Sequence, residues 1–157
     1  MAVAAVLAVA GCGGDDSGGT RLTKPELITR GDAICSKYRA KNEALNKEAP
    51  AKNPTDPSAS DDEVRKAAPV LRKLADNLRD ARGEFSRLTP PAEVESDWQN
   101  TLDDQDQLAS KLDDAADAAS ALDRQRVVEE FGEILRLNRR INTFEVDYGF
   151  RVCGKSA

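Results

Sequence analysis

The chain has 157 residues, of which 39% are hydrophobic and 32% are charged, so it can form one domain with a real core. Its net charge of −5 excludes a general attraction to nucleic acid or to anionic lipid. Histidine is absent, which removes the commonest general base and the commonest metal ligand. Because the sequence also lacks a Ser/His/Asp set, a Cys/His pair and a phosphate-binding glycine loop, we expect a protein that is not an enzyme.

Residues 2–10 form an unbroken apolar run that is followed by Gly11 and Cys12. The run is too short to span a bilayer as a mature helix, but its length suits a signal peptide. The Val-Ala-Gly-Cys motif that ends at Cys12 resembles a bacterial lipobox. This resemblance implies that residues 1–11 are a signal peptide, that cleavage precedes Cys12, and that the Cys12 sulfur carries a covalent diacylglycerol lipid.

The segment after Cys12 reads Gly-Gly-Asp-Asp-Ser-Gly-Gly, a composition that is flexible and solvated. We therefore expect residues 12–22 to be the lipidated cysteine and a linker, and residues 23–157 to form the helical domain. Two acyl chains hold a protein stably on a membrane, so no transmembrane helix is needed. The expected location is the extracytoplasmic face of the cell membrane.

The chain has three cysteines, Cys12, Cys35 and Cys153. If Cys12 carries lipid, an even pair is left, and in an exported protein such a pair predicts a disulfide. Closing so long a loop stabilises the fold by about 5 kcal/mol in the chain-entropy model. The alternative is two free buried thiols. A zinc site is disfavoured because two cysteines without histidine supply too few ligands.

The first helix is predicted from Thr23, which can cap it, to about Glu48, with Pro25 in its first turn. Three prolines make residues 50–60 a loop. The apolar stripe of this helix consists of Leu27, Ile34, Tyr38 and Leu45.

The second helix is predicted to start at residues 60–63, Ser-Asp-Asp-Glu, which have the form of a capping box. Apolar residues then recur at heptad spacing over residues 64–88, as in the seam of a bundle. Pro69 falls inside this run. It either kinks the helix or moves its start to a later residue. Thr89-Pro90-Pro91 ends the helix.

The third helix is predicted over residues 92–122, and its stripe thins to alanines near its end, where helices can approach closely. The fourth is predicted to begin after Asp123, a capping residue, and to end at Gly149. The two stripes consist of Val94, Trp98, Leu102, Leu108, Leu112, Ala115 and Ala119, and of Val127, Phe131, Ile134, Ile141, Phe144 and Tyr148.

Four amphipathic helices with short or moderate connections predict an all-α fold, an up-down-up-down four-helix bundle. The alternative, because of Pro69, is a three-helix or partly extended hairpin. The up-down-up-down topology returns the end of the fourth helix towards the start of the first. It therefore brings Cys153 towards Cys35, in agreement with the disulfide that the cysteine count predicts.

Charge is divided unevenly along the chain. Residues 93–123 hold ten acids and one base, whereas residues 21–52 hold eight bases and four acids. This division predicts helices of complementary charge side by side, with a ligand-steering surface as the alternative. Four acids have a helical spacing that could hold a hard cation, namely Asp103, Asp106, Asp113 and Asp117. Because Ca²⁺ prefers six to eight oxygens from a curled loop, we interpret them as a solvated face and expect no metal site.

Two polar residues, Gln105 and Asn138, interrupt otherwise apolar stripes. They either face each other and set the register of the helices, or line a ligand cavity. Trp98 and Tyr148 are interpreted as core residues, with a ligand platform as the alternative. The ligand candidates are therefore Trp98, Gln105 and Asn138.

The chain as a whole resembles small, uncharacterised helical lipoproteins of high-GC Gram-positive bacteria. Four segments carry this resemblance: Val9-Ala10-Gly11-Cys12, Asp32-Ala33-Ile34-Cys35, Leu88-Thr89-Pro90-Pro91 and Tyr148-Gly149-Phe150-Arg151-Val152-Cys153. The resemblance implies a surface location and a disulfide, and no activity.

The sequence thus favours a non-catalytic binding or interaction module, anchored to the membrane by lipid, that contacts another envelope protein or a cell-wall polymer. The alternative is a small-ligand or metal carrier that uses the bundle interior or the acidic third helix. A cavity lined by Gln105 and Asn138 would favour the carrier. A packed core with an exposed apolar strip would favour the interaction module.

Overall fold

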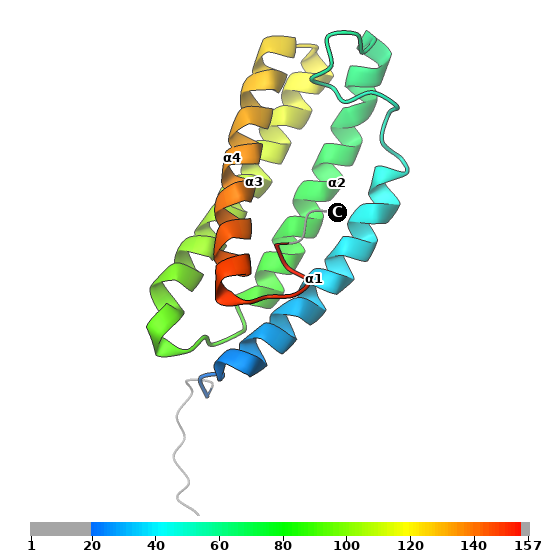
Figure 1. The fold of residues 1–157 in the computed structure, drawn as a ribbon. Coiled ribbons are helices and arrows are strands. Elements are labelled where there is room, and N and C mark those ends of the chain that lie inside the picture. The colour runs from blue at the N-terminus through cyan, green and yellow to red at the C-terminus, as the bar shows by residue number, and fades with distance from the viewer. Residues whose placement is uncertain (1–19, 155–157) are drawn as a thin grey trace, which may run out of the picture.

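The computed structural model describes residues 20–154, and this part of the chain is all-helical (Figure 1). The elements in chain order are α1 (Lys24–Asn46), α2 (Asp61–Phe85), a 3₁₀ turn η1 (Ala92–Val94), α3 (Glu95–Ala121) and α4 (Arg124–Tyr148). The predicted all-α fold with four helices is confirmed. The predicted signal peptide and Cys12 lie outside the described residues. None of the described helices combines the length and hydropathy needed to cross a membrane.

The helix ends follow from local sequence. The Ser60 hydroxyl accepts a hydrogen bond from the Glu63 backbone N–H (3.2 Å), and the Glu63 carboxylate accepts one from the Ser60 backbone N–H (2.8 Å). This is the predicted capping box. Asp123 caps α4 by accepting from the Arg126 N–H (3.1 Å), and Gly149 ends α4 with φ of +105°. That left-handed conformation is one that glycine adopts without strain.

Pro69 lies inside α2, because the helix begins at Asp61 and continues to Phe85. The proline therefore does not move the helix start to a later residue. It has no N–H to donate to the carbonyl oxygen one turn earlier, and its ring crowds that oxygen. The side chain is exposed and contributes nothing to the core that would offset this cost.

We expect Pro69→Ala to raise the free energy of unfolding by about 1–3 kcal/mol, because it restores a helix hydrogen bond and removes the clash. Urea unfolding followed by circular dichroism measures the change. A variant of equal or lower stability would show that α2 needs the proline.

The helices pack in chain order. Figure 1 shows α2 between α1 and α3, and α3 between α2 and α4. Across the described residues, no Cα atom of α1 lies within 8 Å of a Cα atom of α4. The bundle is therefore open along the side between its first and last helices.

The core differs between the two ends of the bundle. At one end five aromatic rings meet, with centroids 5.5–6.5 Å apart: Phe85, Trp98, Phe144, Tyr148 and Phe150. Trp98 and Tyr148 are buried there, as predicted for core residues. At the other end, small buried side chains replace the rings, among them Ala67, Ala68, Ala115, Ala116, Ala118 and Ala119. The alanines near the end of α3 are thus buried against those of α2 at that end.

The segment after α4 returns to α1 and is fixed there. A disulfide joins Cys35 to Cys153, with a Cα–Cα distance of 5.3 Å, which confirms the predicted pair. The Asp32 carboxylate accepts hydrogen bonds from the backbone N–H groups of residues 151–153, at 2.8–3.2 Å. The Phe150 ring lies directly on Gly31. We call this set of contacts the C-terminal clamp.

The clamp predicts opposite effects for two glycine-to-alanine changes. A Cβ at Gly31 would lie 2.4 Å from Cε1 of Phe150, whereas a Cβ at Gly132 would meet no atom within 4 Å. We expect Gly31→Ala to lower the free energy of unfolding by about 1–3 kcal/mol. The control Gly132→Ala should raise it by about 0.5–1 kcal/mol, since alanine is the better helix former. Urea unfolding of both variants measures these changes, and equal effects would contradict the close contact at Gly31.

Candidate functional site

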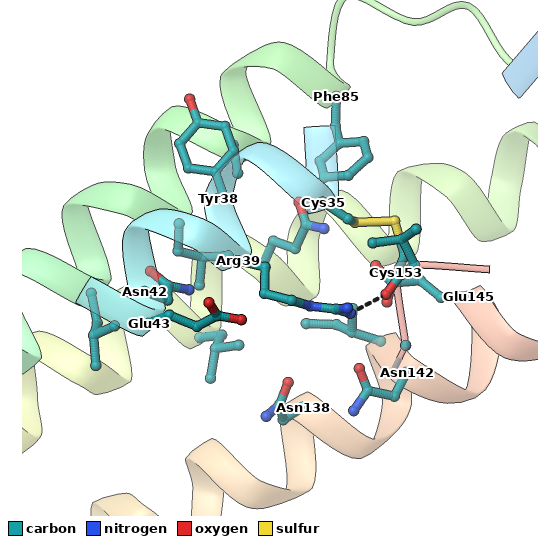
Figure 2. A pocket seen from close by; sticks show the side chains of 18 of the residues that line it. Cys35, Tyr38, Arg39, Asn42, Glu43, Phe85, Asn138, Asn142, Glu145 and Cys153 are labelled. Carbon is teal, nitrogen blue, oxygen red and sulfur yellow. Dashed lines mark hydrogen bonds between the residues drawn. A yellow bond between two sulfur atoms is a disulfide. The ribbon is translucent and has the colours of Figure 1, made fainter. Parts of the chain in front are cut away.

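The open side of the bundle forms a groove between α1 and α4, with a volume of about 400 Å³ (Figure 2). We call it the α1–α4 groove. Its floor is apolar and comes mainly from α2 and α3, whereas its walls are mainly polar and come from α1 and α4. The floor consists of Leu74, Leu78, Ala81, Phe85, Leu108 and Ile141.

The groove continues along α1 beyond this hollow. A second hollow of about 340 Å³ shares Asn46 and Leu74 with the first and extends to Pro50 and Phe131. The two hollows therefore adjoin at Asn46 and Leu74, and together they reach from the C-terminal clamp to the loop after α1. Such a shape suits an elongated ligand.

Asparagines dominate the walls. Of the seven asparagines in the sequence, four line the groove: Asn42 and Asn46 from α1, and Asn138 and Asn142 from α4. Each pair is spaced i, i+4, so its two members share a helix face one turn apart. Figure 2 shows Asn42 on the opposite side of the groove from Asn138 and Asn142. Asn42 also accepts a hydrogen bond from the Asn77 amide at 3.1 Å.

Gln105 brings an amide into the groove from α3. Its side chain is only 5% exposed, and its Oε1 has no hydrogen-bond partner among the described residues. A buried polar atom left without a partner costs about 1–3 kcal/mol. Gln105 and Asn138 line the same cavity, and Gln105 Oε1 accepts no hydrogen bond from Asn138. Of the two alternatives that the sequence left open, the cavity is the one that this geometry favours.

Glu145 lines the groove beside the clamp and is 8% exposed. Burial raises the pKa of its carboxyl group from 4.5 to about 7, and the negative charge of Asp32 acts in the same direction. A hydrogen bond from the Gly154 backbone N–H opposes this rise in pKa. Glu145 therefore titrates near neutral pH. Sequence reasoning missed it, although it follows Ile141 by one turn on the apolar stripe of α4.

Glu145 also lies beside the disulfide. One oxygen of Glu145 and the sulfurs of Cys35 and Cys153 all lie within 4.8 Å of one another. Both sulfurs are bonded to each other, so neither is a thiolate that can bind a metal ion. While the disulfide is intact, the Glu145 carboxylate is the one group of this cluster that could bind a metal ion.

The four acidic metal candidates are spread along α3 and bind other side chains. Asp106 contacts Arg82 at 2.9 Å, Asp117 contacts Arg72 at 2.7 Å, and Asp113 pairs with Arg79. Asp103 accepts a hydrogen bond from Gln99 at 3.0 Å.

The acids of α3 thus lie against arginines of α2 and α4, and not against the basic residues 21–52 as the charge division predicted. The contact between Arg21 and Glu95, at 2.8 Å, is the one ion pair that joins those two segments within residues 20–154. The reason is that α1 packs on α2, so most bases of α1 never reach α3.

Of the three ligand candidates from the sequence, the groove brings together Gln105 and Asn138 and leaves out Trp98. Trp98 is 5% exposed and lies within the aromatic end of the core.

Comparison of the chain with family models, with curated proteins and with solved structures finds no match.

The buried carboxyl group of Glu145 predicts a pH dependence. Between pH 4.5 and about 7 the unfolded chain has lost the Glu145 proton while the folded chain retains it. The contribution of this group to stability therefore falls as pH rises through that window. Glutamine cannot ionise, so Glu145→Gln should gain up to about 3 kcal/mol relative to the unmodified chain across the window. Urea unfolding of both proteins at pH 4.5 and pH 8 measures the difference, and a constant difference would contradict the burial of this charge.

Proposed function

We propose that the chain is an extracytoplasmic lipoprotein that acts as a non-catalytic binding module, and that its ligand occupies the α1–α4 groove. The observation that carries the proposal is an open groove with an apolar floor into which Gln105 brings a buried amide without a partner for its oxygen. The volume of about 400 Å³ lies within the range of ligand pockets. A ligand that donates a hydrogen bond to Gln105 Oε1 would remove the free-energy cost of burying that atom without a partner.

The proposed location rests on two features. The lipobox resemblance at Cys12 supports the lipid anchor. The Cys35–Cys153 disulfide supports an oxidising compartment, because structural disulfides are rare where thiols are kept reduced. A folded domain held by lipid at the outer face of the membrane would present the groove to other molecules of the envelope.

A carrier of a small ligand is the second candidate, because Gln105 and Asn138 line the same cavity. An exposed apolar strip on α4 favours the interaction module instead. Val128, Leu135 and Val146 are 54–59% exposed, and their spacing of 7 and 11 residues places them on one face of α4. The acidic face of α3 supports a metal carrier less well, since three of its four candidate carboxylates pair with arginines of α2.

Mass spectrometry of the protein extracted from the membrane of its own cells tests the location. We expect a chain that begins at Cys12, carries a diacylglyceryl adduct and is lighter by two hydrogens for the disulfide. The control Cys12→Ser should carry no lipid. An unlipidated chain that retains Met1 would overturn the proposed anchor.

Binding of Nile red, a neutral dye whose fluorescence reports an apolar site, tests the groove. Asn138→Trp places a large side chain in the groove opening, and we expect it to weaken dye binding about tenfold or more, because it fills the space above the apolar floor. The control Gln107→Trp changes an exposed polar side chain on α3 outside the groove and should leave binding unchanged. Equal dye binding by all three proteins would overturn the groove as the binding site.

A further inference from the structure

We infer that the ligand of the α1–α4 groove is an extended polypeptide segment whose backbone is bound by the asparagines of α1 and α4. This inference rests on the proposed function and names the class of ligand. It follows from what the four asparagines offer, how they are spaced, and what lies between them.

Three of the four asparagine side chains are fully available to a ligand, and Asn42, whose oxygen accepts from Asn77, keeps its two amide donors. In the part of the chain that the structure describes, the side-chain amides of Asn46, Asn138 and Asn142 make no hydrogen bond. Each amide presents one acceptor and two donors. A peptide group presents one donor and one acceptor, so an asparagine can pair with it through two hydrogen bonds.

The spacing of the asparagines matches an extended chain. Two residues spaced i, i+4 on a helix are separated by about 6 Å along its axis. Peptide groups on the same side of an extended strand recur every two residues, or about 6.6 Å. One strand can therefore direct alternate peptide groups to the α1 pair and to the α4 pair, because its N–H and C=O groups alternate between its two edges.

The floor and the length of the groove agree with this arrangement. When the backbone groups of a strand point sideways to two walls, its side chains point alternately down and up. The downward side chains would contact the apolar floor, with Gln105 as its one amide. Together with the adjoining hollow, the groove reaches along α4 from Phe131 to Glu145, about 21 Å at 1.5 Å per residue, which corresponds to about six residues of extended chain.

The charges of the groove also favour a neutral backbone over a charged ligand. The charged residues of its main hollow are Arg39, Glu43 and Glu145. Arg39 donates to the Val152 carbonyl oxygen, as the dashed line in Figure 2 shows, and Glu145 is buried beside the clamp. The groove therefore lacks the cluster of like charges that would select an anion or a cation.

A library of random peptides of about ten residues, displayed on phage, supplies the probe. It is selected against the full chain in detergent with the disulfide intact, and the affinity of the recovered peptides is measured by fluorescence anisotropy. We expect peptides with alternating apolar residues whose affinity falls about 3–10-fold with Asn138→Ala and with Asn142→Ala, as for the loss of one or two hydrogen bonds. The matched control Asn100→Ala should leave the affinity within about twofold, because this amide lies outside the groove.

N-methylation of single peptide amides separates backbone recognition from general apolar binding. Each methyl group removes one N–H donor and leaves the side chain in place. We expect affinity to fall at the amides that face an asparagine. At one of these positions the loss should be smaller in Asn142→Ala than in the unmodified chain, since both changes remove the same interaction. Methylated peptides that bind as tightly as the unmethylated ones would overturn the inference.

The Nile red experiment distinguishes the two ways to fail. If no peptide is recovered, or if peptides bind Asn138→Trp undiminished, while the same variant loses the dye, the groove binds small apolar molecules and the polypeptide inference is wrong. If Asn138→Trp also retains the dye, the groove is not a binding site and both proposals are wrong.

Discussion

The C-terminal clamp is the contact on which the shape of the bundle depends. It joins the first and last helices at one end, through the Cys35–Cys153 disulfide and through Asp32, which accepts from three successive backbone N–H groups. Within the described residues, no Cα atom of α1 lies within 8 Å of a Cα atom of α4. Because the clamp closes the bundle at one end only, the side between α1 and α4 stays open and forms the groove, whose walls are these two helices.

The other contacts hold the floor of the groove in place. Ion pairs from Arg72, Arg79 and Arg82 to acids of α3 lie along the α2–α3 contact, beside the close packing of alanines at one end and of aromatic rings at the other. Exposed ion pairs contribute little stability, but they favour one register of neighbouring helices over others. The floor is therefore set by α2 and α3, while α1 is attached through α2 and the clamp. The apolar floor therefore comes mainly from the packed pair α2 and α3, and the polar side chains of the walls come from α1 and α4.

Local patterns predicted most of this fold. The capping box at Ser60, the stop at Gly149 and the even cysteine pair each depend on residues close in sequence or on parity, and all three are found. The groove was beyond such patterns, because helical periodicity tells which face of a helix is buried but not which helix covers it. For the same reason the charge division along the chain predicts the wrong partner for the acids of α3, which pair with arginines of α2 and not with residues 21–52. Asn42 and Asn138 line the same groove only because α1 and α4 are held apart, and the sequence of either helix alone does not show that separation.

Three of the departures from a well-satisfied bundle lie along the α1–α4 groove. The backbones of α1 and α4 stay more than 8 Å apart, Gln105 Oε1 is buried without a partner, and Glu145 is a buried carboxyl group. Each lowers stability when taken alone, and a fold selected only for stability would place leucine at both polar positions. Such local conflicts concentrate at functional sites, where a ligand completes what the folded chain leaves unsatisfied. The surplus of amides in the walls points the same way, because hydrogen-bonding groups that the fold does not use are those that a partner can use.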